Sequence, residues 1–293
     1  MSELVKRTAT GLLLLILVIG SILANSLAFV VVFLIILVAT QFEFYRMLTR
    51  AKIRPQSVIG IIIGVFLYLS SFLVSIGFMP NKVFVLFFPL VSLVFVNELF
   101  FNENRPIHNI SFTLFGIFYI AVPFSLFHFM VFEITDDLNI GLNEGRDIVN
   151  FFFQPPNLVE YNYQILLGFF FLHWINDTGA YLIGVPFGKH KLFKRISPKK
   201  SWEGVIGGVM FSLVTVILLA KYFPVLSLFS WLIVAFIVVF FGTLGDLIES
   251  LLKRYLGLKD SGNFLPGHGG FLDRYDGVLF STPIVYAYLQ LIS

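Results

Sequence analysis

Long apolar runs recur along the whole chain and are its most constraining feature. A helix that crosses the hydrocarbon core of a bilayer needs about 20 mostly apolar residues, because hydrocarbon offers backbone amides no other partner. Runs of this kind lie at roughly residues 10–25, 27–46, 56–78, 83–101, 110–132, 163–185, 203–221, 228–252 and 276–292. We therefore predict an all-α integral membrane protein, a polytopic bundle of about nine transmembrane helices.

Composition supports this class and excludes several others. Hydrophobic residues make up 58% of the 293 residues and charged residues only 13%, whereas a soluble domain usually carries about 25% charged residues. Cysteine is absent, which excludes a disulfide framework, thiolate metal sites and cysteine nucleophiles.

The basic residues favour one orientation. With the amino terminus inside, the nine spans place seventeen of the twenty Lys and Arg residues on the inner face, and only Lys82, Arg146 and Lys221 fall outside. This asymmetry agrees with the positive-inside rule. The carboxyl terminus is then expected outside. The sequence leaves open whether residues 8–40 form a hairpin or one overlong helix, but a single helix would invert the later loops and spoil the asymmetry.

We treat residues 1–293 as a single membrane domain with two different halves. The apolar start runs past any plausible signal-peptide core, so we interpret it as a retained anchor. Residues 1–160 are predicted to be mainly scaffold helices. Charged residues enter the spans and the loops between them at residues 173–276, the predicted catalytic half.

The first polar cluster lies inside the sixth apolar run, at residues 174–181. A carboxylate at membrane depth costs about 2.5–3.5 kcal/mol on insertion scales, so Asp177 should face a wet cavity, a cation or a basic partner. Gly179 and Ala180 instead favour close helix packing.

The second cluster is the basic loop at residues 191–204. Its cations are also typical of a topology signal beside anionic lipid headgroups. Hydroxyls and ammonium groups at the start of the seventh helix could equally converge on phosphate. The candidate substrate-binding residues here are Ser197, Lys199, Lys200, Ser201 and Glu203.

The third cluster ends the eighth apolar run. Helical spacing places Asp246, Glu249, Ser250 and Lys253 on one face. An ion-pair ladder from Glu249 to Lys253 is the structural alternative. A polar, glycine-rich segment follows, and its candidate site residues, with Arg254, are Lys259, Asp260, His268, Gly269, Gly270, Asp273, Arg274 and Asp276. Clustered carboxylates without cysteine favour Mg²⁺, which usually shares its shell with substrate phosphate. These residues thus indicate metal-assisted phosphoryl or nucleotidyl transfer at a membrane.

Residues 250–276 resemble the signature of the phosphatidate cytidylyltransferases, also called CDP-diacylglycerol synthases. The resemblance rests on Ser250, Lys253-Arg254, Lys259-Asp260, Pro266-Gly267-His268-Gly269-Gly270, Asp273-Arg274 and Asp276. Similarity extends upstream to about residue 173, whereas the first 160 residues share only their hydrophobicity.

The resemblance implies CMP transfer from CTP to phosphatidic acid, giving CDP-diacylglycerol and pyrophosphate. It implies that Asp246 and Asp273 hold Mg²⁺, alone or with a second cation, and that Asp177, Glu249 and Asp276 are further ligands or lie beside the ligands. It also implies that six cationic residues bind the triphosphate and the lipid phosphate: Lys199, Lys200, Lys253, Arg254, Lys259 and Arg274. His268 would shape its loop or touch phosphate.

The expected partners are therefore CTP, phosphatidic acid and the lipid bilayer, with no nucleic acid; homo-oligomerisation stays open. The expected location is a bacterial inner (plasma) membrane, with the active site facing the cytoplasm. The alternatives are a CTP-dependent lipid-alcohol kinase, a cytidylyltransferase for another lipid phosphate and, from a different class, an ion-coupled transporter whose intramembrane aspartates carry ions.

Overall fold

The computed structural model describes the whole chain except residues 1–2, 102–104, 135–158, 259, 263–268 and 293. Helices dominate the described residues, and two short antiparallel hairpins join them. The chain divides into two compact units. Unit 1 comprises Met1–Tyr163 and Gly262–Phe271, and unit 2 comprises Gln164–Ser261 and Leu272–Ser293. The prediction of a single membrane domain stays a prediction.

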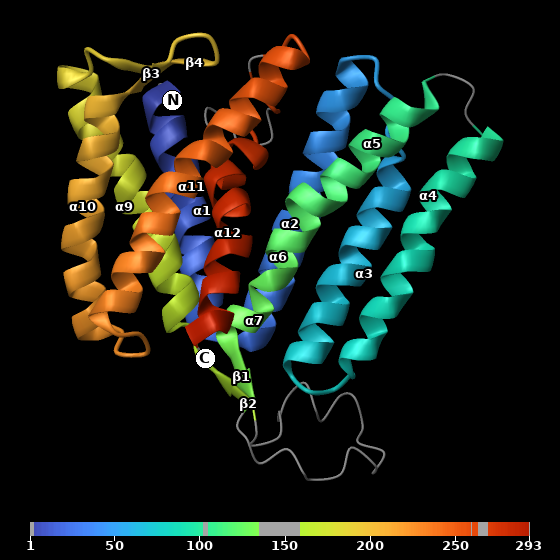
Figure 1. Ribbon diagram of the computed structural model, residues 1–293, viewed down its shortest axis with the longest axis horizontal. Helices are drawn as coiled ribbons and strands as arrows, with labels where there is room; N and C mark the ends of the chain where they lie inside the picture. Colours follow the sequence, from blue (N-terminus) through green and yellow to red (C-terminus); the bar gives the residue numbers. More distant parts are fainter. Residues whose placement is uncertain (1–2, 102–104, 135–158, 259, 263–268, 293) are drawn as a thin grey trace. The chain divides into compact units, whose positions relative to one another are not determined.

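Unit 1 holds the amino-terminal helices (Figure 1). Its elements are α1 (Glu3–Ala24), α2 (Ser26–Arg50), α3 (Ser57–Ser75), the 3₁₀ helix η1 (Asn81–Leu86), α4 (Phe87–Phe101), α5 (Pro106–Gly116), the π-helical turn η2 (Ile117–Ala121), α6 (Val122–Leu126), α7 (His128–Val131), β1 (Phe132–Ile134) and β2 (Val159–Tyr161). Strands β1 and β2 pair antiparallel.

A helical hairpin begins the chain, as the charge pattern predicted. Asn25 separates α1 from α2 in an extended conformation, and its Oδ1 accepts a hydrogen bond of 2.7 Å from the Ala28 amide. Asparagine is a strong N-cap because its side chain satisfies an amide that the new helix leaves unpaired. One polar residue therefore divides the apolar stretch into two helices.

Polar side chains of α2 form hydrogen bonds to neighbouring helices inside the apolar core of unit 1. Gln41 Nε2 donates to the carbonyls of Gly60 and Gly116, and Tyr45 Oη donates to the Thr113 carbonyl at 2.9 Å. Side-chain bonds to backbone carbonyls are a usual means of joining helices in a membrane. They fix α2 against α3 and α5.

Unit 2 contains the remaining helices: α9 (Gln164–Phe187), α10 (Trp202–Tyr222), α11 (Leu228–Tyr255) and α12 (Leu272–Ile292). A hairpin of β3 (Lys191–Phe193) and β4 (Ser197–Ser201) joins α9 to α10, with Lys191 opposite Ser201 and an irregularity before Phe193. In Figure 1 this hairpin lies at the opposite end of unit 2 from the carboxyl terminus.

The structure confirms an all-α polytopic membrane protein. In the described part of the chain, six helical segments are long and apolar enough to cross a membrane: Ser26–Arg50, Ser57–Ser75, Asn81–Phe100, Pro106–Val131, Trp202–Tyr222 and Leu228–Tyr255. The other three predicted spans are also helical, as α1, α9 and α12. The apolar part of α1, Thr10–Ala24, is shorter than those six, and α9 and α12 carry polar residues of the candidate site.

Candidate functional site

Helix α11 carries the polar stripe that its sequence predicted. Ser250 Oγ donates to Asp246 Oδ1 at 3.3 Å, and Lys253 Nζ pairs with Glu249 Oε2 at 2.5 Å. Both contacts span four residues, so the four side chains share one face of the helix. The predicted ladder from Glu249 to Lys253 therefore exists, but its lysine also reaches a second helix.

Lys253 lies between two carboxylates from different helices. Its Nζ is 2.5 Å from Glu249 on α11 and 2.7 Å from Asp273 Oδ1 on α12. Ser261 completes the arrangement, because its Oγ donates to Asp273 Oδ2 at 2.9 Å. Only 13% of the Lys253 side chain and 12% of the Asp273 side chain are exposed. This ion pair thus fixes the start of α12 beside the end of α11.

A second ion pair brings the basic hairpin to the same helix. Lys200 Nζ, on β4, is 2.5 Å from Asp246 Oδ2. The side chains stay partly open to solvent, 27% exposed for Lys200 and 36% for Asp246. The predicted phosphate-binding loop and the predicted metal-binding helix therefore meet.

Two further aspartates complete an acidic cluster. Asp177 on α9 interacts electrostatically with Lys200, Asp246 and Arg274, and Asp276 on α12 interacts with Asp246, Lys200 and Asp177. The cluster comprises Asp177, Lys200, Asp246, Glu249, Lys253, Asp273, Arg274 and Asp276. Five of its members are carboxylic acids and three are cationic side chains.

Glycines let the helices of this cluster approach closely. A Cβ on Gly245 of α11 would come within 2.5 Å of the Asp276 carbonyl and 3.0 Å of Gly277 Cα. A Cβ on Gly179 of α9 would meet the Gly207 carbonyl of α10 at 2.8 Å. Such distances exclude side chains, so small residues set the helix separation. The packing role predicted for Gly179 is confirmed.

The hairpin between α9 and α10 is held by its own side chains. The Ser201 Oγ accepts from the Gly204 amide at 3.2 Å and caps α10. Glu203 Oε1 lies 2.6 Å from His190 Nδ1 and also accepts from the His190 amide. Ser201 and Glu203, predicted to bind substrate, thus make structural contacts that hold Lys200 in place.

Other predicted site residues differ in exposure and in the unit to which they belong. Lys199, Arg254 and Asp260 are exposed, and Ser197 at the start of β4 is half-buried. Gly269 and Gly270 belong to unit 1, and Gly269 has a φ of +78°. Lys259 and His268 lie outside the described residues.

The acidic side chains raise the question of a metal site. Among the side chains that the structure describes, no three acidic or histidine groups converge closely enough to hold a metal ion by themselves. Mg²⁺ usually takes only one or two protein carboxylates and fills its shell with water and substrate phosphate. The carboxylate oxygen donors of the cluster fit that mode of binding.

Glu43 is a site-related residue that the sequence reasoning missed. It is buried on α2, and its Oε2 accepts a 2.8 Å hydrogen bond from the Phe271 amide. A Cβ on Gly262 would lie 2.7 Å from Glu43 Cδ. Glu43 therefore contacts both ends of segment 262–271, which carries the predicted loop histidine. The sequence feature that could have identified Glu43 is its position as a single carboxylate within an apolar span.

His173 was also missed. It lies one turn before Asp177 on α9, and its Nε2 is 2.8 Å from Ser281 Oγ on α12. Both side chains are buried. The contact fixes α9 against α12, the helices that carry Asp177 and Asp276.

Comparison with known proteins shows the family of the chain. A family model described as the Cytidylyltransferase family matches residues 5–292. A phosphatidate cytidylyltransferase of Bacillus subtilis (strain 168) is 44% identical over 146 residues, 49% of this chain and 54% of that protein. Proteins of the same name from Staphylococcus aureus (strain COL) and Staphylococcus haemolyticus (strain JCSC1435) are 50% and 49% identical over 118 residues, 40% of this chain and 45% of each relative.

The chain thus spans about half the length of the curated relatives it matches. The family model, in contrast, covers nearly the whole chain and includes every residue of the acidic cluster. This integral membrane protein belongs to the cytidylyltransferase family.

Proposed function

We propose that the protein is a phosphatidate cytidylyltransferase, which converts CTP and phosphatidic acid into CDP-diacylglycerol and pyrophosphate. A phosphatidate oxygen attacks the α-phosphorus of CTP, and the bond from that phosphorus to the β-phosphate oxygen breaks. The observation that carries the proposal is the net acidic, lysine-bridged cluster of α9, α11 and α12 in a chain of this family.

The residues of the cluster divide by charge into two roles. Lys200, Lys253 and Arg274 neutralise phosphate oxygens and orient them, because ammonium and guanidinium groups form charge-assisted hydrogen bonds with phosphate. The exposed cations Lys199 and Arg254, with Lys259, bind phosphate beside them. Phosphoryl transfer depends mainly on such positioning and charge neutralisation.

The carboxylates are proposed to hold Mg²⁺. Asp246 and Asp273 are the first ligands, and Asp177, Glu249 and Asp276 lie around them. When bound, the ion would supply charge neutralisation to the phosphates. Lys200 and Lys253 now pair with Asp246 and Asp273, and they would be free to bind substrate phosphate if these two carboxylates held the ion. The lysines thus hold the cluster together before substrate arrives.

The site belongs at a membrane boundary for a physical reason. Removing an acyl chain from the bilayer costs about 0.8 kcal/mol per CH₂, whereas CTP is a soluble polyanion. The active site is therefore proposed to face the cytoplasm at the inner face of a bacterial plasma membrane, with the amino terminus inside and the carboxyl terminus outside.

The decisive experiment uses the purified chain in detergent micelles with CTP, phosphatidic acid and Mg²⁺. Formation of CDP-diacylglycerol with an equal amount of pyrophosphate is the expected result, and chelation of Mg²⁺ should abolish it. Release of CDP with a phosphorylated lipid alcohol would instead identify a kinase. Ion flux across vesicles without any nucleotide turnover would identify a transporter.

A further inference from the structure

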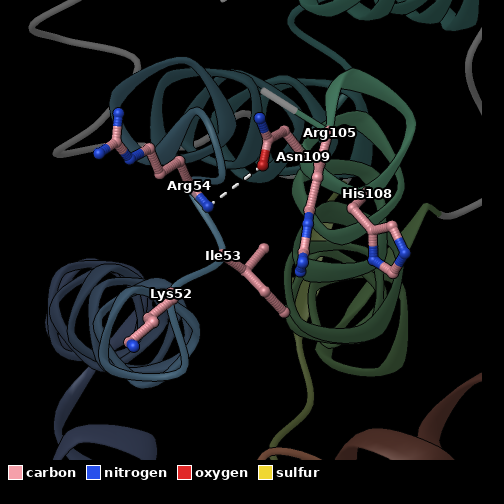
Figure 2. Close-up of a pocket in the computed structure, with 6 residues that line it drawn as sticks. All are labelled: Lys52, Ile53, Arg54, Arg105, His108 and Asn109. Atoms are coloured by element: carbon pink, nitrogen blue, oxygen red, sulfur yellow. Dashed lines mark hydrogen bonds between the residues drawn. The ribbon is translucent and has the colours of Figure 1, made fainter. Parts of the chain in front are cut away.

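A pocket in unit 1 shares no residue with the acidic cluster. Its volume is about 200 Å³, and its lining residues are Lys52, Ile53, Arg54, Arg105, His108 and Asn109. Figure 2 shows the charged ends of Lys52 and Arg54 directed away from Arg105, so these cations do not converge on one ligand. The pocket lies where the α2–α3 connection meets the start of α5, and two basic loops at one end agree with the positive-inside rule.

A buried histidine in unit 2 joins two of the helices that carry the acidic cluster. His173 Nε2 on α9 lies 2.8 Å from Ser281 Oγ on α12. The Ser281 hydroxyl itself donates to the carbonyls of Gly277 at 2.9 Å and Val278 at 3.2 Å. Because a hydroxyl has one hydrogen to donate, Ser281 accepts from His173, and the imidazole carries a hydrogen on Nε2. The bond therefore has a fixed direction, from α9 to α12.

Helix α11 packs against the same contact. A Cβ on Gly242 would lie 3.0 Å from His173 Cε1, and a Cβ on Gly277 would lie 3.0 Å from the Gly242 carbonyl oxygen. Larger residues would crowd both positions, so small residues set the separation of the three helices here. We name this contact the histidine junction, which consists of His173, Gly242, Gly277 and Ser281.

The histidine junction lies about one turn along each helix from an aspartate of the acidic cluster. The pairs are His173 with Asp177 on α9, Gly242 with Asp246 on α11, and Ser281 with Asp276 on α12. The members of each pair are four or five residues apart, which is about 6–8 Å along a helix. On α12 the Gly277 amide also donates to Asp276 Oδ1 at 2.7 Å. A change of helix register at the junction would therefore move the three carboxylates relative to one another.

Packing alone does not account for a histidine at this place. Phe169 contacts the His173 ring edge-on, with ring centroids 4.8 Å apart, and Phe169 and Leu172 are buried. An apolar side chain would fill such a space at less cost, since burying a polar group is unfavourable unless the group is hydrogen-bonded. The imidazole adds one bond of defined length and direction, and a single buried polar residue can fix the register of packed helices.

We propose that His173 is a positioning residue for the cytidylyltransferase reaction: through Ser281 it sets the register of the three helices that carry the aspartates. The catalytic part of this inference rests on the proposed function. The imidazole is buried and its Nε2 hydrogen is committed to Ser281, so we assign it no contact with substrate. Misplaced carboxylates should weaken transition-state binding more than ground-state binding, so the effect belongs to kcat rather than to KM for CTP.

The first measurement needs no substrate. Because the chain has no cysteine, the exposed residues Leu182 on α9 and Ala287 on α12 can be replaced by cysteine and spin-labelled in the purified full chain. Electron–electron double resonance then gives the distance between the two labels. His173→Leu and Ser281→Ala should each shift or broaden the distance distribution. His173→Gln retains an N–H donor and should leave the distribution unchanged.

The second measurement is turnover of CTP with phosphatidic acid. His173→Leu and Ser281→Ala should each lower kcat about 10–100-fold, the order of loss that a misplacement of up to about 1 Å produces, and should change KM for CTP less than kcat. The double variant should be no slower than the slower single variant, since both substitutions remove the same bond. His173→Gln should restore most of the activity.

Thr282→Val is the matched control. Thr282 is buried next to Ser281 in the sequence, and its hydroxyl bond stays within α12, at the Val278 carbonyl. This variant should keep the label distances and turn over CTP at the normal rate.

Unchanged label distances in both His173→Leu and Ser281→Ala would overturn the proposal, and so would an equal loss of kcat in Thr282→Val. Ser281→Ala answers the question if His173→Leu fails to fold. If the unsubstituted chain forms no CDP-diacylglycerol, the proposed function fails, and the label distances still decide whether His173 sets the register of α9 and α12.

Discussion

Single charged side chains decide how the acidic cluster is held. Lys253 contacts Glu249 and Asp273 while almost buried, so each carboxylate depends on the same ammonium group. Breaking a buried ion pair typically costs about 3–5 kcal/mol, because the remaining charge is left without compensation. Asp246 differs from this pair. Its side chain is 36% exposed and pairs with Lys200, which is also partly exposed, so solvent and substrate can reach this pair.

Because Asp246 is partly exposed, neutralising it should disturb the packing less than neutralising a buried carboxylate of the cluster. Asp246→Asn should lower kcat/KM for CTP at least about 10²-fold at any Mg²⁺ concentration, since it removes charge from the proposed metal ligand without opening the core. Asp273→Asn should also abolish turnover. Both variants should remain inserted in the membrane, which extraction and thermal unfolding would check.

Glu160→Gln on β2 is the matched control, because it neutralises an exposed carboxylate outside the cluster. It should turn over CTP at the normal rate. Near-normal activity in both aspartate variants would remove these residues from the proposed metal site.

At the scale of elements, helix capping and close glycine contacts explain the arrangement. Asn25 separates α1 from α2, and Ser201 starts α10, each through a local hydrogen bond to an amide of the new helix. The meeting of Asp246 with Asp276 instead requires α11 and α12 to touch at Gly245 and Gly277. Helicity could be predicted from the sequence, but the partner of each helix face could not, because several apolar faces are interchangeable.

Segment 262–271 gives the element-scale prediction. Glu43→Ala removes the acceptor of the Phe271 amide and the contact with Gly262, so both ends of the segment should lose this support. We expect kcat to fall about 10²-fold, the order of loss that a misplacement of about 1 Å produces. Glu43→Gln retains an acceptor oxygen and should restore most of the activity.

Thr40→Val is the control for a general packing defect, because Thr40 is buried on the same helix and bonds its own backbone at Ile36. It should leave kcat unchanged. If Glu43→Ala and Thr40→Val lowered the unfolding temperature and kcat equally, Glu43 would have no positioning role.

At the scale of the whole molecule, the distribution of basic residues along the chain predicts its orientation in the membrane. In unit 2 the basic hairpin and the carboxyl terminus lie at opposite ends (Figure 1), as the odd number of predicted spans requires. The positive-inside rule assigns the hairpin end to the cytoplasm. In unit 1, Lys52, Arg54 and Arg105 line one pocket, so the two loops that carry them share one end, as the topology predicted.

The absence of cysteine makes this orientation simple to test. Lys82→Cys and Lys194→Cys place single thiols at exposed positions that the topology assigns to opposite faces. In intact cells a membrane-impermeant maleimide should label the first variant only, and permeabilisation should expose the second. The reverse labelling would invert the topology and remove the site from the cytoplasm.

The sequence by itself determined the helical membrane class, the approximate spans, the acidic stripe of α11 and the family resemblance. Hydrophobicity and helical period are local properties, so they can be read along the chain. Only the tertiary structure decided which polar groups meet: Lys200 with Asp246, Lys253 with Asp273, and Glu43 with the backbone amide of Phe271, 228 residues away. It also brought Lys52 and Arg105 to one pocket. These contacts depend on which helix faces pack together. The packing is set by the summed free energy of many weak contacts between distant segments, and a local sequence pattern does not contain that information.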